Sequence, residues 1–139
     1  MTTESLNKTW FIDIDGTIVH HLSNKEIDEA IDTMGEKSFL VEKPIEKSVE
    51  FLGNLPNSDT VVLTTARDGR HKQHTLKMLK HLRVRYDEIM FDLRSGPRYL
   101  INDTKPVGAA GNAKPLNTAY AINVERDLGI TKNPLKLCS

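Results

Sequence analysis

The alternation of apolar and polar positions along the chain predicts five β-strands. Residues 9–14 and 60–65 are mainly aromatic, aliphatic or β-branched, and both runs end in polar groups, as is typical of central strands whose ends carry function. Shorter apolar pieces over 86–91, 99–102 and 118–124 predict three more strands. Strands separated by helical segments indicate an α/β fold.

Amphipathic spacing predicts a first and a second helix between the two long strands. The first is expected to begin at a cap formed by Ser23 or Asn24 and to stop at Gly35. The second covers residues 45–55 and ends before Pro56. Their expected buried side chains are Ile27, Ala30, Ile31 and Met34 in the first helix and Ile45, Val49, Phe51 and Leu52 in the second.

A third predicted helix, residues 70–82, is basic on one side. Its inward side chains are expected to be Leu76, Leu79 and Leu82. Its outer, solvated face is expected to carry the Lys and His side chains: His71, Lys72, His74, Lys77, Lys80 and His81. A basic helix also suggests contact with nucleic acid, but solvated faces of this kind are common, so nucleic acid is the less favoured partner.

Together these elements predict one doubly wound, Rossmann-like α/β domain over residues 1–139, with a mainly parallel sheet in three layers. The carboxyl ends of strands 9–14, 60–65 and 99–102 would then meet at one edge of the sheet. Residues 19–43 are too few for a large cap domain. We expect them to form a flap or a minimal cap.

Composition limits which partners and which cellular location are expected for the protein. The 19 basic and 19 acidic side chains balance, so any polyanion would need a local basic patch. Cys138 is the only cysteine, which excludes a disulfide or a thiolate metal site within the chain. No apolar run is long enough to span a membrane, and residues 1–8 lack the apolar core of a signal peptide. We therefore expect a cytoplasmic protein without a membrane partner.

Asp13 and Asp15 are the first candidates for chemistry. They follow the apolar run of the first strand, and residues two apart in a strand point to the same face. Two such carboxylates repel each other unless a positive group neutralises them, and Mg²⁺ is a hard cation that prefers oxygen ligands. Gly16 allows a sharp turn directly beyond them. The simpler alternative is a strand end with two solvated acids before an Asp-Gly turn.

The sequence D-I-D-G-T of residues 13–17, placed after an apolar strand, resembles the first motif of the haloacid dehalogenase-like (HAD) hydrolase superfamily. Most members are phosphatases that pass through an aspartyl-phosphate. The resemblance implies that Asp13 is the nucleophile, that Asp15 is the general acid and base, and that Gly16 lies next to the phosphate. It also implies a Mg²⁺ cofactor, and the small flap is similar to that of the capless members.

The sequence T-T-A-R of residues 64–67 resembles the second motif of the same superfamily. Thr65 is the expected donor to a phosphoryl oxygen. Thr64 is the alternate, because neighbouring residues in a strand point to opposite faces. Ala66 and Arg67 are expected beside the phosphate or the substrate.

The sequence Y-L-I-N-D of residues 99–103 resembles the fourth motif, whose last acid, here Asp103, would complete the Mg²⁺ site of Asp13 and Asp15. Asn102 stands where the family often has Asp or Gly. The third motif is normally a Lys upstream of this strand, and none is present. Arg94 or Arg98 would take its place, and Arg94 is nearer to the expected spacing.

The resemblance implies an enzyme, a Mg²⁺-dependent phosphomonoesterase, that acts on a small phosphorylated sugar or related metabolite. One alternative is a polynucleotide 3′-phosphatase, which shares the first motif and a D-G-R turn like that of residues 68–70. Another is a catalytically silent phosphate- or nucleotide-binding module, which Asn102 and the missing Lys favour. A homo-oligomer is compatible with an open site that either the flap or a second subunit closes.

Overall fold

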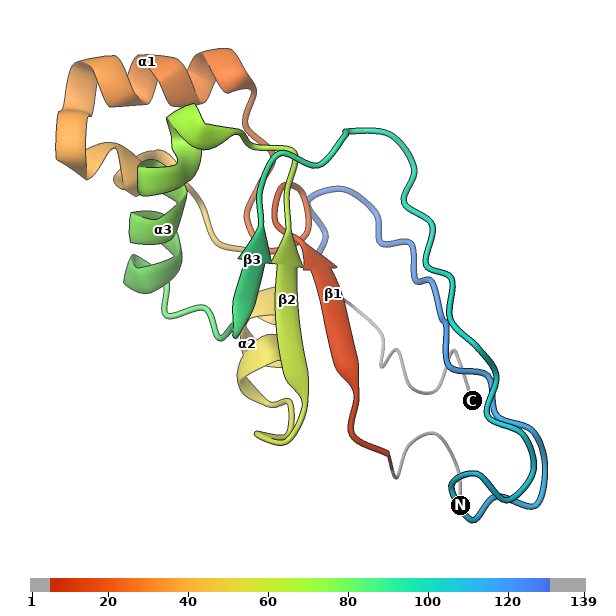
Figure 1. Ribbon diagram of the computed structural model, residues 1–139. Coiled ribbons are helices and arrows are strands. Elements are labelled where there is room, and N and C mark those ends of the chain that lie inside the picture. Colours follow the sequence, from red (N-terminus) through yellow and green to blue (C-terminus); the bar gives the residue numbers. More distant parts are fainter. Residues whose placement is uncertain (1–5, 131–139) are drawn as a thin grey trace.

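The computed structural model describes residues 6–130 and has an α/β fold built on three parallel strands (Figure 1). The strands are β1 (Thr9–Asp13), β2 (Thr60–Thr64) and β3 (Glu88–Met90), in that order across the sheet. Asp13 is the register partner of Thr64, and Thr64 is the partner of Met90, so the three strands end at the same level. The strands predicted over 9–14 and 60–65 are therefore confirmed to within one residue, and the one over 86–91 is confirmed in shorter form.

Three α-helices and two short 3₁₀ helices connect these strands. They are α1 (Asn24–Met34), η2 (Gly35–Val41), α2 (Glu46–Gly53), η3 (Gly69–His71) and α3 (Lys72–His81). The predicted start and stop of the first helix are confirmed. The Ser23 hydroxyl accepts a hydrogen bond from the Glu26 backbone N–H at 3.1 Å, Glu26 accepts one from the Ser23 N–H at 3.0 Å, and Gly35 ends α1 at a φ of 57°.

Both α2 and α3 pack against one face of the sheet. The buried cluster joins Ile12 and Leu63 of the strands to Leu52 of α2 and to Met78 and Leu79 of α3. In a sheet whose strands follow one another in chain order, right-handed crossovers place successive helices on the same side. Alternate residues point the other way, and of these Phe11 and Met90 are exposed. Within residues 6–130, the core thus lies on a single face of the sheet.

Two of the three histidines expected on the solvated face of the third helix, His71 and His74, do not lie on it, so this part of the prediction is wrong, whereas His81 is exposed as predicted. His71 and His74 are buried, as are Thr75, Met78 and Leu79. The reason is that one ring nitrogen of each has an acidic partner, although Nδ1 of His71 is buried without a hydrogen-bond partner among the described residues. His71 Nε2 lies 2.6 Å from Asp28, and His74 Nε2 lies 2.8 Å from Glu42, so both polar rings can be buried.

The strands predicted over 99–102 and 118–124 are also wrong. Residues 95–124, which we call the arm, run out beyond the β1 edge and return as two neighbouring limbs without forming a strand (Figure 1). A single antiparallel bridge between Lys105 and Leu116 joins the limbs. Tyr99 is 88% exposed and Ile101 is 94% exposed, so the apolar residues that suggested a strand have no cover from residues 6–130.

None of the helices within residues 6–130 has the length and apolar character that crossing a membrane requires.

The two valines at the start of β2 test which face of the sheet is covered. Val61 is fully buried on the helix side, whereas Val62 is only partly buried on the opposite side. We expect Val61→Ala to lower the free energy of unfolding by about 2 kcal/mol and Val62→Ala by clearly less, because only Val61 leaves a cavity in the core. Urea unfolding of the two variants measures both values. Equal losses would contradict a core on one face.

Candidate active site

The carboxyl ends of β1 and β2 bring four of the predicted site residues together. Asp13 and Thr64 are register partners, and Asp15 lies beyond the end of β1, where its side chain meets Thr65. The charge of Asp15 acts on Asp13, so the two carboxylates are close in space as well as in sequence. The geometry therefore matches the expectation that both acids lie at the carboxyl edge of a parallel sheet.

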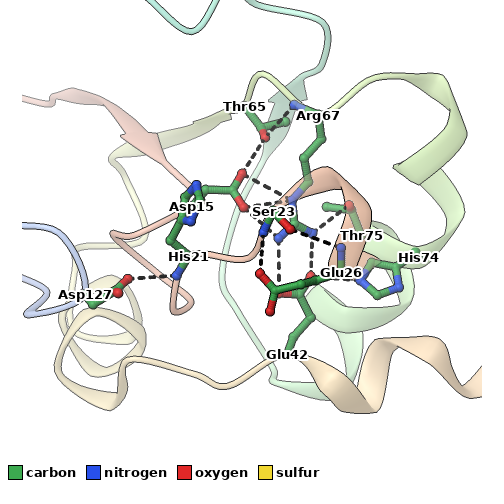
Figure 2. Close-up of polar contacts among 10 residues, drawn as sticks. All are labelled: Asp15, His21, Ser23, Glu26, Glu42, Thr65, Arg67, His74, Thr75 and Asp127. Carbon is green, nitrogen blue, oxygen red and sulfur yellow. Dashed lines mark hydrogen bonds and ion pairs between the residues drawn. The ribbon is translucent and has the colours of Figure 1, made fainter. Parts of the chain in front are cut away.

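Arg67 holds the carboxylate of Asp15 in place (Figure 2). Its Nη2 donates to Asp15 Oδ1 at 2.8 Å, and its Nε lies 3.1 Å from the same oxygen. The hydroxyl of Thr65, which is fully buried, donates to Asp15 Oδ2 at 3.1 Å and accepts from the Arg67 backbone N–H. Both oxygens of Asp15 are thus fixed, although 22% of its side chain remains exposed.

A second group of buried residues, which includes a second carboxylate, also contacts the guanidinium of Arg67 (Figure 2). Arg67 Nη1 donates to Glu42 Oε2 at 2.6 Å and to the Thr75 hydroxyl at 3.1 Å. Glu42 is also hydrogen-bonded to His74 at 2.8 Å, and the other ring nitrogen of His74 is hydrogen-bonded to Ser38. Arg67 was expected beside phosphate or substrate, but among residues 6–130 its side-chain partners are two carboxylates and the Thr75 hydroxyl.

The contacts of Glu42 and Arg67 explain the direction in which the pKa of each side chain is shifted. Burial alone would raise the pKa of Glu42, but the hydrogen bonds from His74 and Arg67 and the charge of Arg67 outweigh burial and lower that pKa below its usual value. Burial would likewise lower the pKa of Arg67, yet Glu42 and Asp15 raise it. The pair is therefore ionised at neutral pH.

Sequence reasoning missed Glu42, His74 and Thr75. An arginine that is buried at a strand end requires a carboxylate partner. This requirement was the feature of the sequence that could have indicated a buried acid next to Arg67. It does not say which of the 19 acidic residues provides the carboxylate, because Glu42 lies 25 positions before Arg67.

Asp13 is paired with Arg98, not with Arg94. Arg98 Nη1 lies 2.9 Å from Asp13 Oδ1 and 3.3 Å from the Thr64 hydroxyl. Arg94 is exposed and has no hydrogen bond or ion pair with residues 6–130. Desolvation raises the pKa of Asp13 above its usual value, although the bond to Arg98 works in the opposite direction. Of the two arginines considered for the missing Lys, the geometry favours Arg98.

The turn after Asp15 depends on Gly16. Its φ is +77°, and a Cβ at this position would lie 3.1 Å from Cγ of Arg126. The Gly16 carbonyl accepts a hydrogen bond from the Asp127 N–H at 2.8 Å, and the Asp127 carboxylate accepts one from the His21 N–H (Figure 2). Ala66, the other small residue of the motifs, is exposed at the end of β2.

The structure does not bring Asp103 to the other two carboxylates. Asp103 is exposed in the arm, where its carbonyl accepts a hydrogen bond from the Thr118 hydroxyl. Within residues 6–130, no group of three His, Cys, Asp or Glu side chains is arranged to hold a metal ion. The Asp13 carboxylate remains as an oxygen donor at this edge of the sheet, and the backbone carbonyl of Asp15 accepts no hydrogen bond from the described residues.

Comparison with protein-family models, with curated proteins and with solved structures gave no match for this chain. A function has to be argued from the site itself.

Replacing the buried carboxylate behind Arg67 tests the network. We expect Glu42→Gln to lower the free energy of unfolding at pH 7 by about 3–5 kcal/mol, because Arg67 loses a buried counter-charge. Since the pKa of Glu42 is lower in the folded than in the unfolded chain, its stabilisation is present above about pH 4.3 and is lost as the pH falls below that value. The difference between wild type and variant should therefore shrink in acid.

Urea unfolding between pH 7 and pH 3 measures this difference. Glu46→Gln, at an exposed position of α2, is the matched control and should change stability by no more than about 0.5 kcal/mol. A gap between wild type and Glu42→Gln that stays constant over this range would contradict the ion pair.

Proposed function

We propose that this chain is a Mg²⁺-dependent phosphomonoesterase that works through an aspartyl-phosphate on Asp13. The observation that supports it best is that two neighbouring carboxylates differ in exposure and in the number of hydrogen bonds that hold them. Asp13 is 36% exposed and has one half-exposed arginine partner, whereas Asp15 is fixed on both oxygens. The proposal includes an HAD-like architecture, which three parallel strands with site residues at their carboxyl ends support, although within residues 6–130 the core covers one face of the sheet and not both, as a doubly wound fold requires.

The chemistry divides between the two acids. A carboxylate oxygen of Asp13 attacks phosphorus, so that an O–P bond to Asp13 forms while the ester P–O bond breaks. The leaving oxygen takes a proton from Asp15. Asp15 then accepts a proton from water, whose oxygen attacks the phosphorus, so that the O–P bond to Asp13 breaks, the Asp13 carboxylate is regenerated and inorganic phosphate is released. The contacts from Thr65 and Arg67 keep Asp15 oriented for both transfers.

Arg98 and Thr64 are the groups best placed to bind the phosphoryl oxygens. Both lie beside Asp13, and Arg98 already interacts with the Asp13 carboxylate. A guanidinium binds a phosphate group with the same geometry as it binds a carboxylate. The Thr65 hydroxyl donates to Asp15, so the phosphate contact expected of Thr65 passes to its alternate, Thr64.

We propose that Mg²⁺ would bind beside Asp13, where a substrate phosphate would have to supply ligands as well, because no three acidic or His side chains among residues 6–130 are grouped to hold a metal ion. This cation is usually held by one or two carboxylates together with substrate phosphate and water, and Asp13 and the Asp15 carbonyl offer oxygen ligands. When bound, Mg²⁺ would neutralise charge between the nucleophile and the phosphate dianion. We further propose a small phosphorylated sugar or related metabolite as the substrate, because the balanced net charge gives no general attraction to a polyanion.

Removing the nucleophile tests the mechanism. Asp13→Asn should abolish release of phosphate from an aryl phosphate in the presence of Mg²⁺, while circular dichroism shows an intact fold, because an amide oxygen cannot form the acyl-phosphate. Asp32→Asn, an exposed position of α1, is the control and should retain wild-type turnover. Full activity of Asp13→Asn would exclude the mechanism. Absence of chelator-sensitive activity in the wild type, across sugar phosphates, nucleotides and 3′-phosphorylated oligonucleotides, would favour a binding module.

The two arginines provide a second test. Arg98→Ala should lower kcat/KM by about ten- to a hundredfold, because a charged hydrogen bond to the phosphate is lost. Arg94→Ala should leave kcat/KM unchanged, since Arg94 has no contact with the site in the described chain. The comparison uses steady-state kinetics on the same substrate. A larger loss for Arg94→Ala would reverse the assignment.

A further inference from the structure

The arm leaves apolar side chains and backbone groups without partners among residues 6–130. Tyr99 and Ile101 are almost fully exposed, and Leu100, Tyr120 and Ile122 are also exposed. Apolar residues scattered singly on a surface are ordinary, but a contiguous exposed run of this kind marks an interaction site. The segment 99–101 also carries no charge that would discourage strand pairing.

The outer edge of β1 offers backbone groups with which such a segment could pair. Among residues 6–130, β1 lies at the border of the sheet and pairs with β2 alone. The Lys8 carbonyl and the Ile14 N–H both bond to β2, and alternate residues of a parallel strand bond to alternate sides. The backbone groups of Thr9, Phe11 and Asp13 therefore face outward. β1 contains no Lys and no Pro, the residues with which proteins usually protect an edge.

We propose that two copies of this chain form a dimer in which the arm of each copy pairs with the β1 edge of the other. Segment 99–102 would run parallel to β1, so that Asp103 of the second copy arrives beside Asp13. The contribution of Asp103 to the site rests on the proposed function, whereas the pairing itself does not.

A second copy is the favoured occupant because one chain carries both halves of the interface. The extended apolar segment and the open edge strand are present in every copy, so a two-fold axis satisfies both at once. No additional partner is required to cover either surface.

Arg98 explains why the same chain does not supply its own Asp103. Arg98 contacts Asp13, which anchors the start of the arm at the carboxyl end of β1. From there the limb runs away from the site, and five extended residues span about 16 Å. In this arrangement Arg98 lies at Asp13, whereas Asp103 of the same chain is exposed in the arm. With two copies, Arg98 comes from one chain and Asp103 from the other.

The molecular mass in solution tests the pairing without reference to activity. Light scattering after size-exclusion chromatography should give the mass of two chains for the wild type and of one chain for Ile101→Asp, because a buried, unpaired carboxylate would disfavour the interface. Leu40→Asp, at an exposed position of η2 outside the arm, should remain dimeric. A monomeric wild type, or a dimer that Ile101→Asp leaves unchanged, would overturn the proposal.

Mixing two inactive variants tests the placement of Asp103. Asp13→Asn and Asp103→Asn should each be inactive, but after joint refolding half of the dimers are mixed and one of their two sites is intact. Activity should then return to about a quarter of the wild-type value per chain. No recovery, in a mixture shown to be dimeric, would overturn the sharing of the site. If the wild type is inactive, the proposed function fails, and the mass measurement still decides whether the arms are exchanged.

Discussion

The buried guanidinium of Arg67 is the interaction on which the rest of the site depends. A charge with almost no solvent contact must be paired, and Arg67 has one carboxylate on each side, Asp15 at the strand ends and Glu42 before α2. Thr75 and His74 attach α3 to the same network. Because the segment before α2, the strand ends and α3 all meet at one cation, the orientation of Asp15 is a property of the whole fold.

This dependence explains which features could be predicted from sequence. The strands over 9–14 and 60–65 and the capped helix α1 are specified by local patterns, namely apolar runs and a capping box between Ser23 and Glu26. Glu42 could not be found in this way, since nothing in its local sequence distinguishes a buried counter-ion from a solvated glutamate. The burial of His74 follows from Glu42 and was missed for the same reason.

The arm illustrates a different limit. The run Tyr99-Leu100-Ile101 has the composition of a strand, but a strand forms only when a neighbouring strand satisfies its backbone groups, and in residues 6–130 none does. Local sequence reports the capacity to pair and not the presence of a partner. The same local view favoured Arg94 over Arg98, because spacing along the chain does not show which of the two side chains reaches Asp13.

Two carboxylates at the end of one strand need two positive partners, and the chain provides them in different forms. Arg67 is buried and bonded on both sides, so Asp15 has a permanent counter-ion. Arg98 is 39% exposed and has one carboxylate contact, so its interaction with Asp13 is weak in water and open to exchange. An incoming anion can take over the guanidinium, and a cation can then neutralise Asp13. In the proposed mechanism, the fixed geometry of Asp15 serves proton transfer, while the weaker pairing of Asp13 leaves it available to react.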